Sequence, residues 1–182
     1  MGLVESVRKF LFNRFLKRHE QKSSTQSHVL NWSKIATVGV VYRIDQEQDL
    51  KRFHSFIKSI GKNRVVDFLL VQAERKSLTE SNNEKLLTVE DFTWAQYPKQ
   101  TEHEFFAKKY DLLLASGFPF DRHLISCSAL SKAKIKISNQ TQFPDSFDLI
   151  VSDDTNGVDS LQTQIDVLQA LSPHTSSSPV LA

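Results

Sequence analysis

The polar side chains best suited to chemistry follow the apolar runs that we predict to be strands. In parallel α/β sheets, ligands bind beyond the carboxyl ends of the strands. Residues that follow such runs therefore define a candidate ligand crevice. Its predicted members are Arg43, Ser116, Arg122, His123, Asp153, Asp154 and Asn156.

Two parts of this crevice have specific chemical interpretations. His123, beside Asp121 and Arg122, has the side-chain type of a general acid or base. A solvated first helical turn is the favoured alternative, because no nucleophile accompanies the histidine. The aspartates of residues 152–157 could bind a divalent cation, but such a run before Asn-Gly is more typical of a turn and a helix N-cap. We predict no catalytic residue and no metal site.

The glycine pattern disfavours nucleotide cofactors. Dinucleotide-binding and P-loop sites need a glycine-rich turn after the first strand. Here that strand leads into Tyr42 and Arg43 without a glycine, and the whole chain contains only 5 glycines in 182 residues. We predict no cofactor.

Cysteine content and hydropathy indicate a reducing compartment. The single cysteine, Cys127, excludes an internal disulfide and the usual cysteine-rich zinc sites. Its apolar helical surroundings predict an inert, buried thiol. No apolar run reaches the length of a membrane span, and the N-terminus lacks the apolar stretch of a signal peptide. We therefore expect a cytoplasmic protein, with peripheral association at the inner membrane surface as an option.

The elements that position the crevice centre on residues 110–137. A buried strand over 110–115, a helix to about residue 132 and a strand to 137 form a βαβ unit. Before it we predict a strand over 35–42, a helix ending at Gly61, a strand over 65–71, a polar loop over 72–90, a short strand over 91–94 and a short helix over 101–109. After it come a strand over 147–151 and an amphipathic helix over 158–171.

This alternation predicts the fold class and the domain organisation. We expect a single three-layer, doubly wound α/β domain with a mainly parallel sheet of five or six strands, preceded by a basic amphipathic helix. The predicted segments are a leader helix (1–22), a linker (23–33), a Rossmann-like α/β domain (34–171) and a flexible tail (172–182).

The leader helix carries a charge distinct from that of the remaining chain. Its net charge is +4, whereas the whole chain is +2. Leu3, Val7, Phe10 and Leu11 form its predicted apolar face, with Val4 and Phe15 near its border. Three interpretations remain open: packing on its own domain or on a second subunit, binding to an anionic membrane surface, or binding to RNA phosphates as in ribosome-associated proteins. The predicted contact residues are Arg8, Lys9, Arg14, Lys17, Arg18 and Lys22.

Several segments resemble an uncharacterised bacterial family of short cytosolic proteins. The shared features are the basic leader, the Trp94–Pro98-Lys99 segment, the strand from Tyr110 and the A-L-S-K-A-K motif of residues 129–134. The chain departs from that pattern at Ala115, where the family tends to have an acidic residue. This resemblance implies the fold and no reaction. The pattern of one strand and of the helix end that follows it is also similar to the N-terminal half of heptosyltransferase-type GT-B glycosyltransferases. A chain of 182 residues has no room for the second domain of those enzymes.

Together these observations favour a binding protein over an enzyme. We predict a non-catalytic α/β module that its basic helix recruits to a membrane surface or to RNA or the ribosome. A homodimer through the leader is a further alternative. If the protein is an enzyme, a small glycosyltransferase-like transferase or a hydrolase that uses the crevice is the expected class.

Overall fold

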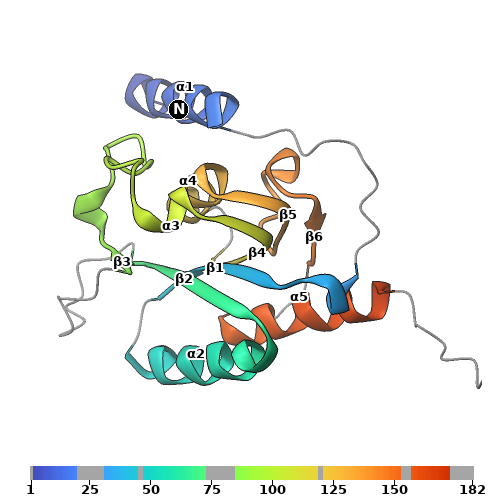
Figure 1. The fold of residues 1–182 in the computed structure, drawn as a ribbon. Coiled ribbons are helices and arrows are strands. Elements are labelled where there is room, and N and C mark those ends of the chain that lie inside the picture. The colour runs from blue at the N-terminus through green and yellow to red at the C-terminus, as the bar shows by residue number, and fades with distance from the viewer. Residues whose placement is uncertain are drawn as a thin grey trace, which may run out of the picture.

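The chain folds into a six-stranded sheet covered by helices, as the computed structural model in Figure 1 shows. The structure describes residues 2–19, 31–44, 47–72, 85–118, 121–152 and 157–172. The strands are β1 (Thr37–Arg43), β2 (Val65–Val71), β3 (Leu86–Leu87), β4 (Lys109–Ser116), β5 (Lys132–Ser138) and β6 (Leu149–Ile150). The α-helices within the described ranges are α1 (Leu3–His19), α2 (Glu47–Ile60), α3 (Glu104–Ala107), α4 (Arg122–Leu130) and α5 (Val158–Leu171).

All six strands run parallel, in the order β3-β2-β1-β4-β5-β6. The order changes direction between β1 and β4, so the first half of the chain builds one side of the sheet and the second half the other. Helices α2 and α5 cover one face, and α3 and α4 cover the opposite face (Figure 1). These observations confirm the predicted three-layer α/β fold with a parallel sheet of five or six strands.

The central strand β4 supplies side chains to both layers of the core. Leu112 and Leu114 pack toward α2 and α5, whereas Leu113 and Ala115 pack toward α4. All four are fully buried. Because successive side chains of a strand point to opposite faces, a strand covered on both faces must be apolar at every position. The continuous apolar run of residues 112–115 therefore identified this strand correctly.

Three predicted elements differ in the structure. The short strand predicted over 91–94 is wrong: a capping box between Thr88 and Asp91 closes a 3₁₀ turn (Val89–Asp91), and Phe92 makes only an isolated bridge to Pro98. The helix predicted over 101–109 is one turn long, since Lys109 already pairs with Lys132 in the sheet. The predicted loop 72–90 contains the edge strand β3, and residues 73–84 of that loop lie outside the described residues.

Helix α1 packs on its own domain, against the α4 layer (Figure 1). Phe12, Phe15 and Leu16 are buried, and the ring of Phe15 stacks on that of Tyr97 with 4.6 Å between centroids. The predicted apolar face of the leader is therefore wrong, because it includes the exposed residue Phe10, has Phe15 only near its border and omits Phe12 and Leu16. Leu3 and Val7 are exposed on the side of the helix opposite this buried stripe, and Val4 is exposed at the edge of that side.

The error has a physical cause. Apolar residues occupy two opposite stripes of α1, so helical periodicity alone did not distinguish which stripe faces the domain. The buried stripe is the one with partners for its aromatic rings. Tyr97 stacks on Phe15, and Phe143 meets the edge of Phe12.

Candidate functional site

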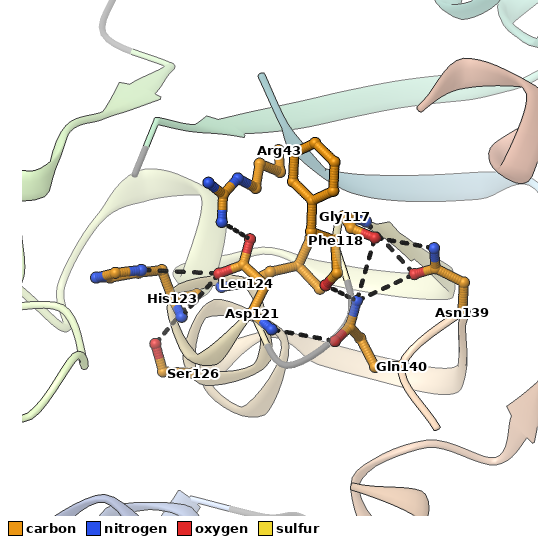
Figure 2. Close-up of polar contacts among 9 residues, drawn as sticks. All are labelled: Arg43, Gly117, Phe118, Asp121, His123, Leu124, Ser126, Asn139 and Gln140. Carbon is orange, nitrogen blue, oxygen red and sulfur yellow. Dashed lines mark hydrogen bonds and ion pairs between the residues drawn. The ribbon is translucent and has the colours of Figure 1, made fainter. Parts of the chain in front are cut away.

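The carboxylate of Asp121 is the centre of the polar cluster beyond β1 and β4 (Figure 2). Its side chain is fully buried, and its Oδ2 lies 3.2 Å from Nη1 of Arg43, at the end of β1. Its Oδ1 accepts hydrogen bonds from the backbone N–H groups of His123 and Leu124, at 3.1 and 3.2 Å. Asp121 is thus the N-cap of α4. It connects the end of β1 to the start of this helix.

The electrostatics of Asp121 favour its ionised form. Burial alone would raise the pKa of this carboxyl, but hydrogen bonding to His123, the charge of Arg43 and the Leu124 N–H hold the pKa below its ordinary value. The imidazole Nδ1 of His123 lies 3.7 Å from Oδ1 of Asp121. Asp121 is therefore a charged anchor for two cationic or ionisable side chains.

The amides of Asn139 and Gln140, just after β5, hold the turn that follows β4. Asn139 Nδ2 donates to the Gly117 carbonyl at 2.9 Å, and Gln140 Nε2 donates to the Phe118 carbonyl at 2.7 Å. Gln140 Oε1 accepts from the backbone N–H of Asp121 at 3.3 Å. The cluster therefore consists of groups that satisfy one another and the main chain.

The structure brings only some of the predicted crevice residues together. Arg43 and His123 meet at Asp121. The hydroxyl of the buried Ser116 donates to the Gly157 carbonyl at 3.1 Å. Arg122 belongs to a different environment, because its Nη1 lies 3.1 Å from Oε1 of Glu5 on α1. Asp153, Asp154 and Asn156 lie outside the described residues.

The favoured interpretation of the sequence, which placed His123 in a solvated first helical turn, is wrong. The residue is buried, and its ring meets the edge of the Phe92 ring at 4.5 Å between centroids. The segment that contains Phe92 covers this start of α4. The burial of His123 therefore depends on a tertiary contact with Phe92, which the local sequence around His123 does not indicate.

A small cavity of about 140 Å³ lies where the strand order reverses, between the ends of β1 and β4. Arg43, Gly117 and Phe118 line it together with residues of α2 and α5. The Arg43 guanidinium carbon lies 4.9 Å from the Phe118 ring centroid. Small-molecule sites usually enclose about 300–1,000 Å³. This volume is therefore well below the usual size of such a site.

The sequence interpretation missed Asn139 and Gln140. Their position directly after a predicted strand was the available signal, since strand ends meet at one edge of a parallel sheet. Asp121 was noted only as a neighbour of His123, although an aspartate directly before a helix is a typical N-cap. Cys127 is a free, fully buried thiol, and burial raises its pKa well above the ordinary value. The prediction that this thiol is buried is confirmed.

The outward face of α1 combines apolar and basic side chains. We define it as Leu3, Val4, Val7, Phe10, Arg14, Lys17 and Arg18. Leu3 and Phe10 are 83% and 64% exposed. The spacing of residues 3, 7, 10, 14 and 17 places them on one stripe of the helix, opposite the buried stripe. Lys9 is exposed at the side of the helix, Arg8 contacts Glu5 at 3.5 Å, and Lys22 lies outside the described residues.

Two further kinds of site are absent from the residues that the structure describes. No helix among them is long and apolar enough to cross a membrane. Within the same residues, no group of three or more histidine, cysteine, aspartate or glutamate side chains has the arrangement of a metal site.

Comparison with protein families identifies one match. The model of a family of unknown function (DUF6913) matches residues 8–167, and the chain therefore belongs to this family. The match includes most of α1 together with all strands of the sheet. Comparisons with curated proteins and with solved structures found no match.

Proposed function

We propose that the protein is a non-catalytic binding module that attaches to an anionic membrane surface through the outward face of α1. The observation that carries this proposal is the exposure of Leu3, Val4, Val7 and Phe10 on a helix whose opposite side is anchored to the domain. Contiguous exposed apolar side chains of this kind are typical of interaction surfaces.

The order of residues along the outward face suits a lipid surface. The apolar side chains occupy the first half of α1, and Arg14, Lys17 and Arg18 occupy the second half. Apolar side chains of interfacial helices enter the acyl boundary, while lysine and arginine reach the phosphates. Each basic residue near an anionic leaflet contributes about 1 kcal/mol, and each buried large apolar side chain about 1.5–3 kcal/mol. These magnitudes are sufficient for reversible attachment.

The apolar residues favour a membrane over RNA as the partner. Binding to nucleic acid through phosphates requires cationic side chains and is weakened by salt. It gives no reason for Leu3 and Phe10 to be exposed on the same face as the basic residues. A lipid surface accounts for both kinds of side chain with one docking geometry.

The polar cluster at the strand ends favours a structural role for these side chains over a catalytic one. Asp121, Asn139 and Gln140 are used to hold the main chain of the turn after β4 and the start of α4. The strand order also matches that of Rossmann-like folds. That order supports a Rossmann-like relationship, but fold alone assigns no reaction.

Vesicle flotation of the full chain tests the proposal. Vesicles of phosphatidylglycerol in phosphatidylcholine should carry the protein upward, and pure phosphatidylcholine vesicles should carry much less. The double variant Leu3→Ser/Phe10→Ser should reduce binding by roughly tenfold or more, because it removes two exposed apolar anchors. Its thermal unfolding should stay unchanged, since both side chains face solvent.

Three results would overturn the proposal. One is flotation of the double variant at the wild-type level. Another is binding of single-stranded RNA, measured by fluorescence anisotropy, without binding of anionic vesicles. The third is a dimer in light scattering that the double variant converts to a monomer, which would assign the outward face to a second copy of the chain.

A further inference from the structure

A groove of about 700 Å³ separates α1 from the start of α4. Its volume falls within the roughly 300–1,000 Å³ of small-molecule sites. One wall consists of residues of α1, and the other includes Arg122 and Phe143. This groove is not part of the outward face of α1. It is also far larger than the cavity between β1 and β4.

Positive charge predominates in the groove. Arg8, Lys9 and Arg122 line it, and Glu5 is the one carboxylate among its lining residues, so the net charge of the lining is +2. The carboxylate of Glu5 lies between two guanidinium groups, with Oε1 3.1 Å from Arg122 Nη1 and Oε2 3.5 Å from Arg8 Nη1. Glu5 therefore occupies the position of an anion bound by two arginines.

The two sides of this ion pair differ in their freedom to move. The Arg122 side chain is 22% exposed, and it also donates a 3.2 Å hydrogen bond to Oε1 of Gln96. Its guanidinium carbon lies 5.7 Å from the centroid of the Phe12 ring. Glu5 is in the first turns of α1 and more exposed. The carboxylate can therefore turn into solvent while the Arg122 guanidinium keeps its place.

Arg8 supplies a further donor that is not in use. Its Nε atom is buried, and no described residue accepts a hydrogen bond from it. A buried donor without an acceptor is costly. Guanidinium groups bind phosphate and carboxylate oxygens through several N–H donors, and Nη1 of Arg8 already faces the Glu5 carboxylate in the groove.

We propose that the groove between α1 and α4 binds a small organic phosphate monoester, and that Glu5 is an internal competitor that the ligand displaces. A monoester carries a charge of about −1.5 to −2 at neutral pH, which complements the net charge of the lining. The partly exposed ring of Phe143, which packs on the buried ring of Phe12 at 5.8 Å between centroids, provides an apolar surface for the organic part of the ligand.

Isothermal titration calorimetry of the full chain with phenyl phosphate tests this site. Phenyl phosphate should bind more tightly than inorganic phosphate, because its ring can pack on Phe143. The variant Arg122→Gln should weaken binding by about tenfold, as expected for the loss of a charge-assisted contact. The variant Glu5→Gln should tighten binding several-fold, because it removes the competitor. A merely structural role of Glu5 would not have that effect.

Arg18→Gln is the matched control for net charge, because Arg18 lies on the same helix but not in the groove. It should leave the affinity for phenyl phosphate unchanged. Equal weakening by Arg18→Gln and Arg122→Gln would overturn the proposal, since it would indicate general charge attraction. Binding that Glu5→Gln weakens or leaves unchanged would overturn the competitor role and the site with it.

The same variants separate this site from the proposed membrane attachment. Arg122→Gln should retain flotation on phosphatidylglycerol vesicles, and Leu3→Ser/Phe10→Ser should retain the affinity for phenyl phosphate. Vesicles that contain phosphatidic acid, a monoester lipid, identify the source of the ligand. If Arg122→Gln weakens binding to these vesicles as well as to phenyl phosphate, the monoester is a lipid headgroup. If it weakens only the binding of phenyl phosphate, the ligand is a free phosphate.

Discussion

The hydroxyl of Tyr110 lies 3.4 Å from Oδ2 of Asp67, although their strands, β4 and β2, are not neighbours. Strand β1 runs between them, and the Tyr110 ring crosses it over Gly39. A Cβ atom at position 39 would lie 3.0 Å from that ring. Burial, followed by the charge of Asp67 and the hydrogen bond to it, raises the pKa of Tyr110. Gly39 therefore leaves room for the Tyr110 ring to cross β1, and a polar contact can join the non-neighbouring strands β4 and β2.

Substitution of Gly39 by alanine should destabilise the fold. The new methyl group would press on the Tyr110 ring and on Leu113, which lies 3.1 Å away, and both are buried. Overpacking of this kind costs about 1–3 kcal/mol. Urea denaturation should show this loss. The control is Gly61→Ala, where the nearest atom would be 3.8 Å from the new methyl group. Equal stability of Gly39→Ala and wild type would show that the ring has room to move.

The ion pair between Arg43 and Asp121 should contribute more to stability than an exposed ion pair does. Asp121→Ala removes the N-cap of α4 and leaves the Arg43 guanidinium without its buried carboxylate. We expect a loss of about 2–4 kcal/mol in the free energy of unfolding.

The matched control for this loss is Asp159→Ala. It breaks the Arg52–Asp159 pair, in which both side chains are about 60% exposed. The loss expected there is about 0–1 kcal/mol. Similar losses for the two variants in urea denaturation would contradict the central role of Asp121.

The acid stability of the protein should depend on Asp111. The side-chain hydrogen bond from Lys134 is the main influence that lowers its pKa, and backbone N–H groups of Thr37 and Ala36 add to it. The resulting pKa is about 2, against 3.8 for the free group. Because the folded state favours the ionised form, this stabilisation is complete above the unfolded value and is lost as the pH falls through about 2.

Melting temperatures of wild type and Asp111→Asn between pH 6 and 2 test this dependence. The variant should melt at a lower temperature near neutral pH, and the difference should shrink toward pH 2. Lys134→Met should reproduce part of the effect, because it removes the partner with the largest influence. Parallel curves for wild type and Asp111→Asn over this range would show that Asp111 contributes nothing to the pH dependence.

Cys127 should be unreactive in the folded protein. Its thiol is fully buried in α4, and the raised pKa keeps it protonated at neutral pH, whereas the thiolate is the reactive form. Its reaction with an aromatic disulfide reagent should become fast only at urea concentrations that unfold the chain. Rapid labelling under native conditions would mean that α4 opens locally.

Local patterns were sufficient to predict the central elements of the fold. The apolar runs that became β1, β2 and β4 were long enough to be recognised, because strands buried on both faces have few polar positions. Strands β3 and β6 contain only two residues each. Segments of that length have no measurable period, so β3 was assigned to a loop.

The candidate site was less predictable, because its contacts join distant parts of the chain. Glu5 and Arg122 are separated by 117 positions, and nothing in either local sequence indicates their pairing. The same holds for Phe92 against His123. Hydropathy also could not distinguish the two apolar stripes of α1, since the choice depends on Tyr97 and Phe143 in the folded domain.

The brevity of β3 and β6 has a consequence for how the protein behaves in a crowded cell. They form the two margins of the sheet, and an outermost strand with many unpaired amides is a template on which other chains aggregate. A margin only two residues long supports very few such intermolecular contacts. A chain that added beyond β3 or β6 would therefore gain few main-chain hydrogen bonds there, while β2 and β5 each pair with these margins over only two residues.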